Sequence, residues 1–262
     1  MGYITYQNAR DFIYRNARPL DFSRFQYHFE GGSSESVLDA LLAYQNNDGG
    51  FGHALEPDIW NPYSNPIQTF TATEILREIN FTDKYHPIIK GILEYLVSGK
   101  DFEDRFWYQA VESNNDFPHA PWWHVEPQSI SPHTYNPSAA LVGFIIRYGS
   151  KESDIYRLAC SIIKEAYEYC LEYGIPRDMA TLGCIIRMTQ YLVESNTFDI
   201  IDTSNLLVIL KEKVKETITK DTSLWLTNYI CKPSLFISSN SSAFYDDNMD
   251  IAEYECKFIV NS

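Results

Sequence analysis

The sequence predicts an all-α protein built from stacked helical hairpins. Apolar residues recur at helical spacing along most of the 262-residue chain, strand-like alternation is short and rare, and most connecting turns are short. We expect about nine or ten helices on this pattern. No linker or low-complexity run divides the chain, so residues 1–262 are expected to form a single domain.

The predicted helices can be justified in chain order. The first has capping serines at its start, in "SSESVLDALLAYQN", and the second begins at Pro66, in "NPIQTFTATEILREI". The third repeats isoleucine at helical spacing, in "PIIKGILEYLVSG". The fourth is apolar nearly all round, in "NPSAALVGFIIRYG", and should therefore be buried. The others are "SDIYRLACSIIKEAYEYCLEYG", "RDMATLGCIIRMTQYLVES", "SNLLVILKEKVKETI" and "DIAEYECKFIV".

Composition excludes several classes of function. A net charge of -14 should repel polyanions, so no nucleic-acid partner is expected. No apolar run approaches the length of about 18 residues that a membrane span needs. The five cysteines are odd in number and form no C-x-x-C pair, which predicts small buried thiols in the cytoplasm rather than disulfides or a zinc site. A 15% aromatic share suits the lining of a small-molecule cavity.

Two segments have the spacing of a degraded repeat. The first runs from Leu41 and Gln45 to Gly49-Gly50-Phe51. The second places Lys90-Gly91, Tyr95-Leu96 and Lys100 before Arg105-Phe106-Trp107. Together they resemble the glutamine-tryptophan repeat of triterpene cyclases, although Lys100 stands where that repeat has Gln and Arg105 where it has Gly. "QNNDGGFG" also resembles the Q-x-x-D-G-G-F turn of protein prenyltransferase β subunits.

Both families share the α/α toroid, so the resemblance implies an inner ring of helices wrapped by an outer ring. The chemistry of the turn agrees with a structural role, which we describe as a latch. Gln45 can cap backbone groups at the end of the preceding helix, the glycines permit positive φ, and Asp48 can bond the backbone two residues on. The chain is short for a complete toroid and ends without a closing Gly-x-Trp turn. An incomplete ring, a small relative and a truncated product therefore remain alternatives.

The resemblance implies a protein that binds an apolar or isoprenoid-like small molecule in a central aromatic cavity. It does not supply a reaction, because the D-x-D-D acid motif of triterpene cyclases and the zinc-binding D-x-C of prenyltransferases are both absent. No phosphate-binding or dinucleotide motif occurs either, so no cofactor is predicted.

The first candidate site follows the Gly-rich turn and leads into a predicted helix. "HALEPDIWN" contains His53, Glu56 and Asp58 as candidate catalytic residues, followed by Trp60 and Asn61 as candidate ligand-binding residues. Glu56 and Asp58 suit paired carboxylates in which one raises the pKa of the other. The alternative is a solvated loop whose acids are stabilised near a helix start.

The second candidate site is the long loop "DFPHAPWWHVEPQSISPHTYNPS". Its candidate ligand-binding residues are His119, Trp122, Trp123, His124 and Asn136. Adjacent indoles offer stacking and cation–π faces, which favours an aromatic ligand wall over a metal site and leaves a plain core plug beneath the loop as the alternative. The histidines, which include His133, lack the spacing of zinc ligands, so no metal is predicted.

A third stretch, "FYDDNMDIAEYE", contains Asp246, Asp247 and Asp250 in the D-D-x-x-D pattern that prenyl-diphosphate enzymes use to hold magnesium. No second acidic motif faces it in the sequence, so acids at a helix start are the favoured interpretation.

Three functions follow from the sequence. The first is an isoprenoid-binding toroid with cyclase or transferase chemistry. The second is a carbohydrate-active (α/α) barrel enzyme, in which Trp122 and Trp123 stack sugars and Asp58 or Glu56 acts with a second carboxylate. The third is a non-catalytic interaction scaffold. The lining of the cavity should separate them: Phe, Tyr and Leu favour the first, and carboxylates about 5 to 9.5 Å apart favour the second.

Overall fold

The computed structural model describes residues 3–126, 135–176 and 178–261 and confirms the all-α class. Within these ranges the chain forms ten α-helices and one two-stranded antiparallel ribbon in which Phe102 faces Trp107. The helices are α1 (Tyr3–Asn16), α2 (Pro19–Phe29), α3 (Ser34–Leu42), α4 (Pro66–Glu78), α5 (Pro87–Val97), α6 (Ser138–Tyr148), α7 (Asp154–Tyr173), α8 (Met179–Glu194), α9 (Thr203–Thr217) and α10 (Met249–Asn261), and the strands are β1 (Phe102–Glu103) and β2 (Phe106–Trp107).

The helices begin where short polar side chains can satisfy free backbone N–H groups. Ser33 accepts from the backbone N–H of Ser36 at the start of α3. Asn65 caps α4 in the same way and is followed by Pro66, whose missing N–H costs nothing at the first helical position. Asp178 and Asp202 cap α8 and α9. These caps account for the predicted helix starts.

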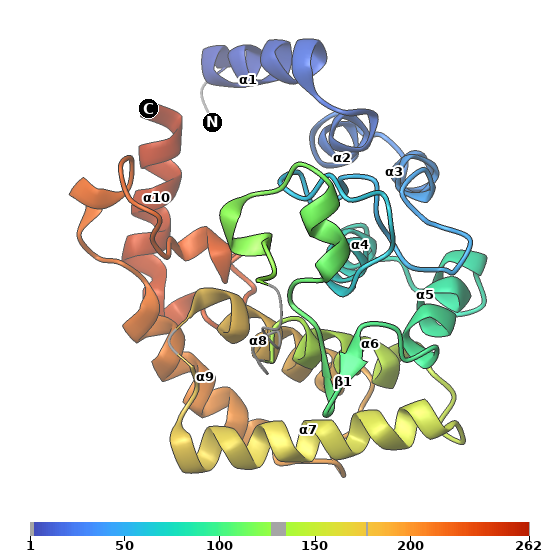
Figure 1. The fold of residues 1–262 in the computed structure, drawn as a ribbon. Coiled ribbons are helices and arrows are strands. Elements are labelled where there is room, and N and C mark those ends of the chain that lie inside the picture. The colour runs from blue at the N-terminus through green and yellow to red at the C-terminus, as the bar shows by residue number, and fades with distance from the viewer. Residues whose placement is uncertain (1–2, 127–134, 177, 262) are drawn as a thin grey trace.

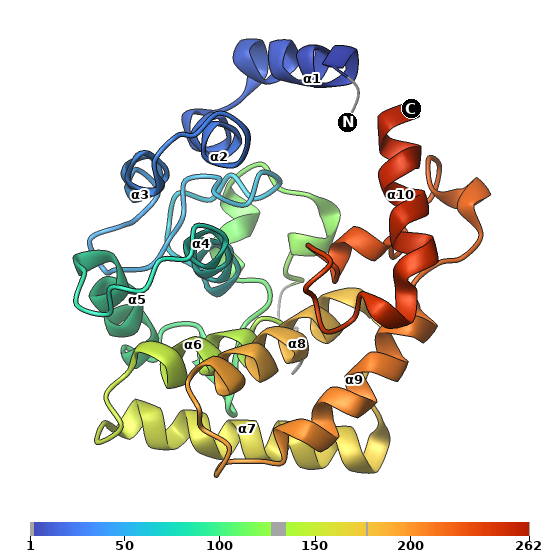
Figure 2. The same cartoon turned by 180° about the vertical axis from the view of Figure 1, so that it is seen from behind.

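The helices follow one another around the molecule (Figure 1). Helices α1, α2, α3, α5, α7, α9 and α10 occupy the rim, while α4, α6 and α8 lie inside it, and the reverse view shows the same order (Figure 2). The first and last helices approach each other, and the Thr5 hydroxyl lies 3.5 Å from the carbonyl oxygen of Val260. The toroid itself stays a prediction.

The inner helices build the core. Helix α6 packs against α4, α7 and α8, and every residue from Ser138 to Ile146 is buried, which confirms the expectation from its nearly uniform apolar sequence. One cluster of buried apolar residues extends from Leu20 in α2 to Ala252 in α10. The loops that carry the candidate site residues are therefore attached to packed helices at their ends.

The Gly-rich turn after α3 forms a latch with the predicted internal bonds. The backbone N–H of Gly50 donates to Asp48 Oδ1 at 3.1 Å, and Gly49 has a φ of 84°. The Gln45 amide donates to the Gly49 carbonyl at 2.9 Å and to the Ile88 carbonyl in α5 at 3.3 Å. The prediction that Gln45 caps the end of α3 is therefore wrong, because its amide joins the turn to α5 instead.

The cysteines agree with the sequence prediction only in part. All five are unpaired, and Cys170, Cys184 and Cys231 are buried. Cys160 is half-buried and Cys256 is exposed on α10, so the expectation of burial is wrong for Cys256. Over the described residues, no helix combines the length and the apolar character that crossing a bilayer requires.

Candidate functional site

The two loops predicted to carry the site are paired through their backbones. Ile59 and His119 form an isolated antiparallel bridge. The N–H of Trp60 donates to the Pro118 carbonyl and the N–H of Ala120 donates to the Asp58 carbonyl, each at 2.9 Å. We call residues 53–63 and 113–124 the paired loops. Their contact brings together most of the candidate residues that the sequence placed in two separate segments.

The buried side chain of Asn61 joins the two paired loops through hydrogen bonds. Its side chain is fully buried and donates to Ser113 Oγ at 2.8 Å and to Asn114 Oδ1 at 3.0 Å. Its carbonyl accepts from the Gln68 amide of α4 at 3.0 Å, and the same Gln68 accepts from the N–H of Leu55. Asn61, predicted as a ligand-binding residue, therefore positions the loops. Its partners Asn114 and Gln68 carried no signal in the sequence.

Asp58 orients both adjacent tryptophans. Its Oδ1 accepts from the Trp123 indole N–H at 2.7 Å and its Oδ2 accepts from the Trp122 indole N–H at 3.1 Å. An aspartate side chain suits this arrangement, because each of its two oxygens can accept one indole N–H. Asp58, predicted as catalytic, is thus placed to fix the indoles of the second loop.

Several aromatic rings of the paired loops are exposed to solvent. Ile59, the bridge residue, is buried, whereas Trp60 beside it is exposed. Trp60 is 61% exposed, Tyr63 58% and Trp122 66%. The Tyr63 ring meets Phe117 of the other loop edge to face at 5.8 Å. We call Trp60, Tyr63, Phe117 and Trp122 the aromatic surface; Tyr63 and Phe117 were missed in the sequence.

Glu56 lies beside this surface with a raised pKa. Burial of the carboxyl is the larger cause and the negative charge of Asp58 the second, while the hydrogen bond from the Thr71 hydroxyl and the charge of Arg18 oppose the shift in pKa. The sequence predicted such a pair, in which one carboxylate raises the pKa of the other, although burial contributes more than the neighbour does.

The raised pKa of Glu56 makes stability depend on pH. The folded state holds the Glu56 proton more tightly than the unfolded chain does. The stability that this proton contributes is fully present below the unfolded pKa of about 4.3, and it is lost as pH rises through the higher folded pKa. We therefore expect Glu56→Gln to become progressively more stable than the wild type over that interval. Urea unfolding at a series of pH values checks this, and a difference that does not change with pH would contradict it.

The histidines of the site are paired with neighbours. His119 and His124 stack at 5.4 Å, with His119 Nε2 3.2 Å from His124 Nδ1. His119 Nδ1 lies 2.6 Å from the Phe117 carbonyl, which only accepts, so Nδ1 carries the proton in the neutral ring. His53, predicted as catalytic, is exposed and its Nε2 lies 2.9 Å from Asn46 Oδ1. His133 falls outside the described residues. Among those described, no three His, Cys, Asp or Glu side chains are placed to hold a metal ion.

Asn136 lies in a different environment from the other candidates. It is buried just before α6, and its side-chain oxygen lies 3.4 Å from the Cys184 sulfur of α8. The contact is with the packed inner helices rather than with the paired loops. The structure thus groups Glu56, Asp58, Trp60, Trp122 and Trp123 and places Asn136 in the core.

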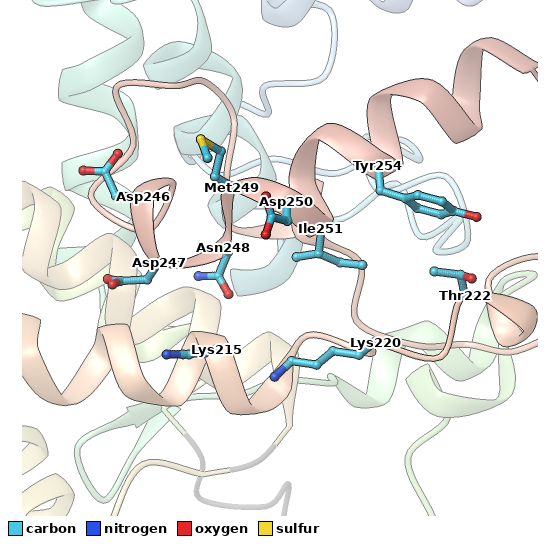
Figure 3. Close-up of a pocket in the computed structure, with 10 residues that line it drawn as sticks. All are labelled: Lys215, Lys220, Thr222, Asp246, Asp247, Asn248, Met249, Asp250, Ile251 and Tyr254. Atoms are coloured by element: carbon cyan, nitrogen blue, oxygen red, sulfur yellow. The ribbon is translucent and has the colours of Figure 1, made fainter.

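Asp246 and Asp247 lie in the turn just before α10 and Asp250 lies in its first turn, and all three line a pocket of about 500 Å³ that Lys215 and Lys220 also line (Figure 3). The three carboxylates are spread along the rim rather than converging (Figure 3). Asp247 pairs with Lys211 at 3.8 Å. Over the described part of the chain, these side chains accept no bond from a backbone N–H, so they favour the helix through its dipole rather than as caps.

The inner helices line a cavity with charged walls. It has a volume of about 910 Å³ and includes Arg77 and Glu74 of α4 and Arg187 and Glu194 of α8. These four side chains form two ion pairs across the helices, Arg77 with Glu194 and Arg187 with Glu74. The lining also includes Phe81, Tyr148 and Tyr191, but the ion pairs on the walls suit a polar ligand or a structural role better than an isoprenoid.

Comparisons of the chain with protein-family models, with curated proteins and with solved structures found no match.

Proposed function

We propose that the protein binds a carbohydrate on the aromatic surface of the paired loops. The observation that carries this proposal is the pair of indole bonds to Asp58, because they order Trp122 while its ring stays 66% exposed. An ordered aromatic ring loses little conformational freedom on binding. Sugar rings have apolar C–H faces that pack on such a ring and hydroxyls that bond to nearby carboxylates. The charged walls of the inner cavity favour this function over isoprenoid binding.

Replacement of the exposed tryptophans tests this function. We expect Trp122→Ala to weaken binding of an oligosaccharide by about 30-fold, the loss typical of a central aromatic anchor. The measurement is calorimetric titration with the oligosaccharides that bind the wild type in a glycan screen. Tyr229→Ala is the matched control, since Tyr229 is 92% exposed and does not belong to the aromatic surface.

Two outcomes would contradict the proposal. The first is a wild-type protein that binds no oligosaccharide in the screen. The second is a Trp122→Ala variant that binds as tightly as Tyr229→Ala. In either case the exposed rings would fit the third function better, an interface with another macromolecule.

Glu56 supports glycosidic cleavage as a second candidate function. Glycosidases need a carboxylic acid that keeps its proton near neutral pH beside a second carboxylate that stays ionised. The raised pKa of Glu56 is in the direction that a general acid needs, and Asp58 is the neighbouring carboxylate that contributes to the shift. If the protein cleaves the sugar it binds, Glu56→Gln should abolish turnover and leave binding intact. Loss of both would assign Glu56 to binding alone.

A further inference from the structure

A basic pocket lies away from the aromatic surface, at the ends of α6 and α8. It has a volume of about 550 Å³, and its lining includes Lys84, Arg147, Lys151 and Ser195. Lys84 belongs to the turn before α5 and Lys151 to the turn between α6 and α7, which lie near each other in both views (Figures 1 and 2). The Tyr148 hydroxyl donates to the Phe81 carbonyl at 2.8 Å and fixes the end of α6 to the turn before α5.

The charged side chains that line this pocket are mainly positive, although the chain as a whole is negative. The chain carries a net charge of -14, yet three cationic side chains line the pocket and Glu152 is its one carboxylate. The Glu152 carboxylate accepts from the Ser150 hydroxyl at 2.6 Å. Within the described residues, Lys84, Arg147 and Lys151 have no carboxylate within 4.0 Å, whereas many other basic side chains of the protein are ion-paired.

Helix dipoles explain only one of the three cations. Arg147 lies in the last turn of α6, where a positive charge is favourable, and it donates to the carbonyl of Glu194 at the end of α8 at 3.2 Å. Lys84 and Lys151 lie near the starts of helices rather than near their ends. They precede the starts of α5 and α7, at Pro87 and Asp154, where the helix dipole disfavours cations and favours anions. Lys84 lies over the Tyr85 ring at 5.0 Å, but the helix dipole explains the placement of neither lysine.

One residue that lines the same pocket, Ser195, carries a hydroxyl without a partner. The Ser195 Oγ is buried and has no hydrogen-bond partner. Leaving such a group unpaired is unfavourable, so buried hydroxyls without partners are rare. A ligand oxygen in the pocket would accept its proton and remove this cost.

We propose that this basic pocket binds the phosphate group of a small molecule. A phosphate oxygen accepts well from the guanidinium of Arg147, and the Lys84 and Lys151 ammonium groups neutralise its charge. The Ser195 hydroxyl donates to a further oxygen. A dianion with several acceptor oxygens suits three cations from different elements better than a monocarboxylate does. This site goes beyond the carbohydrate surface and does not depend on it.

Titration with inorganic phosphate tests the site, and acetate is the comparison ligand. Both titrations use the same ionic strength, because salt screens the attraction between an anion and exposed cations. We expect phosphate to bind at least about tenfold more tightly than acetate. We expect the double variant Lys84→Gln/Lys151→Gln to lose at least about tenfold in phosphate affinity. Lys90→Gln is the matched control, since Lys90 is exposed on α5 and does not line the pocket.

Ser195→Ala gives a second, independent readout. Removal of an unpaired buried hydroxyl should stabilise the free protein against urea while it weakens phosphate binding. The proposal is overturned if phosphate binds the wild type more weakly than about 10 mM, or if acetate binds equally well. It is also overturned if the double lysine variant binds phosphate as tightly as Lys90→Gln does.

Discussion

Gly49→Ala is expected to lower the free energy of unfolding by about 3 kcal/mol or more. Gly49 has a φ of 84°, which an L side chain adopts only with strain. A Cβ at this position would also lie 2.0 Å from the carbonyl oxygen of Gly91. That neighbour is backbone of α5 and cannot rotate away, so the turn and α5 would have to separate. Urea or thermal unfolding of the purified variant measures the loss.

Gly99→Ala separates the two causes. Gly99 has a φ of 71°, and a Cβ there would meet no atom within 4 Å. It should therefore show the backbone strain alone, about 1 kcal/mol. Equal losses in Gly49→Ala and Gly99→Ala would mean that the close approach of Gly49 to α5 does not contribute to stability.

The latch illustrates what the sequence can predict and what it cannot. The bond from Gly50 to Asp48 and the positive φ of Gly49 connect residues within one turn, and residue types alone indicate them. The contact between Gly49 and Gly91 joins two segments that the sequence presented as separate copies of a degraded repeat. Their meeting depends on how α3 and α5 pack, and no local pattern contains that information.

Lys100 makes a second contact between the two segments that local sequence patterns did not indicate. It stands where the repeat has glutamine, which made the second copy look degraded. In the structure its ammonium group lies 3.4 Å from Asp48 Oδ2, beside the latch of the first copy. An exposed ion pair of this kind adds little stability, but it places the end of the second segment against the first. The two segments therefore form one contact region.

Helix prediction failed mainly at the N-terminus. The stretches that carry α3 to α10 could be identified because apolar residues recur in them at helical spacing. Helices α1 and α2 were not singled out. In α1 the large apolar residues Ile4 and Phe12 are 74% and 66% exposed, so its pattern does not mark a buried face.

The sequence pointed to two long loops rich in proline and aromatic residues, but it did not predict the contacts that their side chains make. The two loops pair through the bridge between Ile59 and His119, and a functional role for them stays a prediction. The sequence assigned Asp58 to catalysis because it stands near Glu56. Its contacts are with Trp122 and Trp123, 64 and 65 residues away in the chain, and only the folded structure brings them together.

Asp58→Asn should release one of the two indoles that the carboxylate holds. An asparagine has one acceptor oxygen, and its NH₂ group would face the second indole N–H, donor against donor. Because the site is partly exposed, we expect a loss of about 1 to 2 kcal/mol in the free energy of unfolding. If the carbohydrate proposal holds, the oligosaccharide affinity should also fall by about tenfold or more, because a mobile Trp122 ring must be ordered again on binding.

The indole N–H signals in a ¹H–¹⁵N NMR spectrum report this change directly. The chain has five tryptophans, so five such signals are expected, and those of Trp122 and Trp123 should move in Asp58→Asn while the others keep their positions. Asp116→Asn is the control, because Asp116 is exposed in the same paired loop and contacts neither indole. If Asp58→Asn leaves all five signals in place, Asp58 does not order the tryptophans. The exposed Trp122 ring would then lack the rigidity on which carbohydrate binding rests.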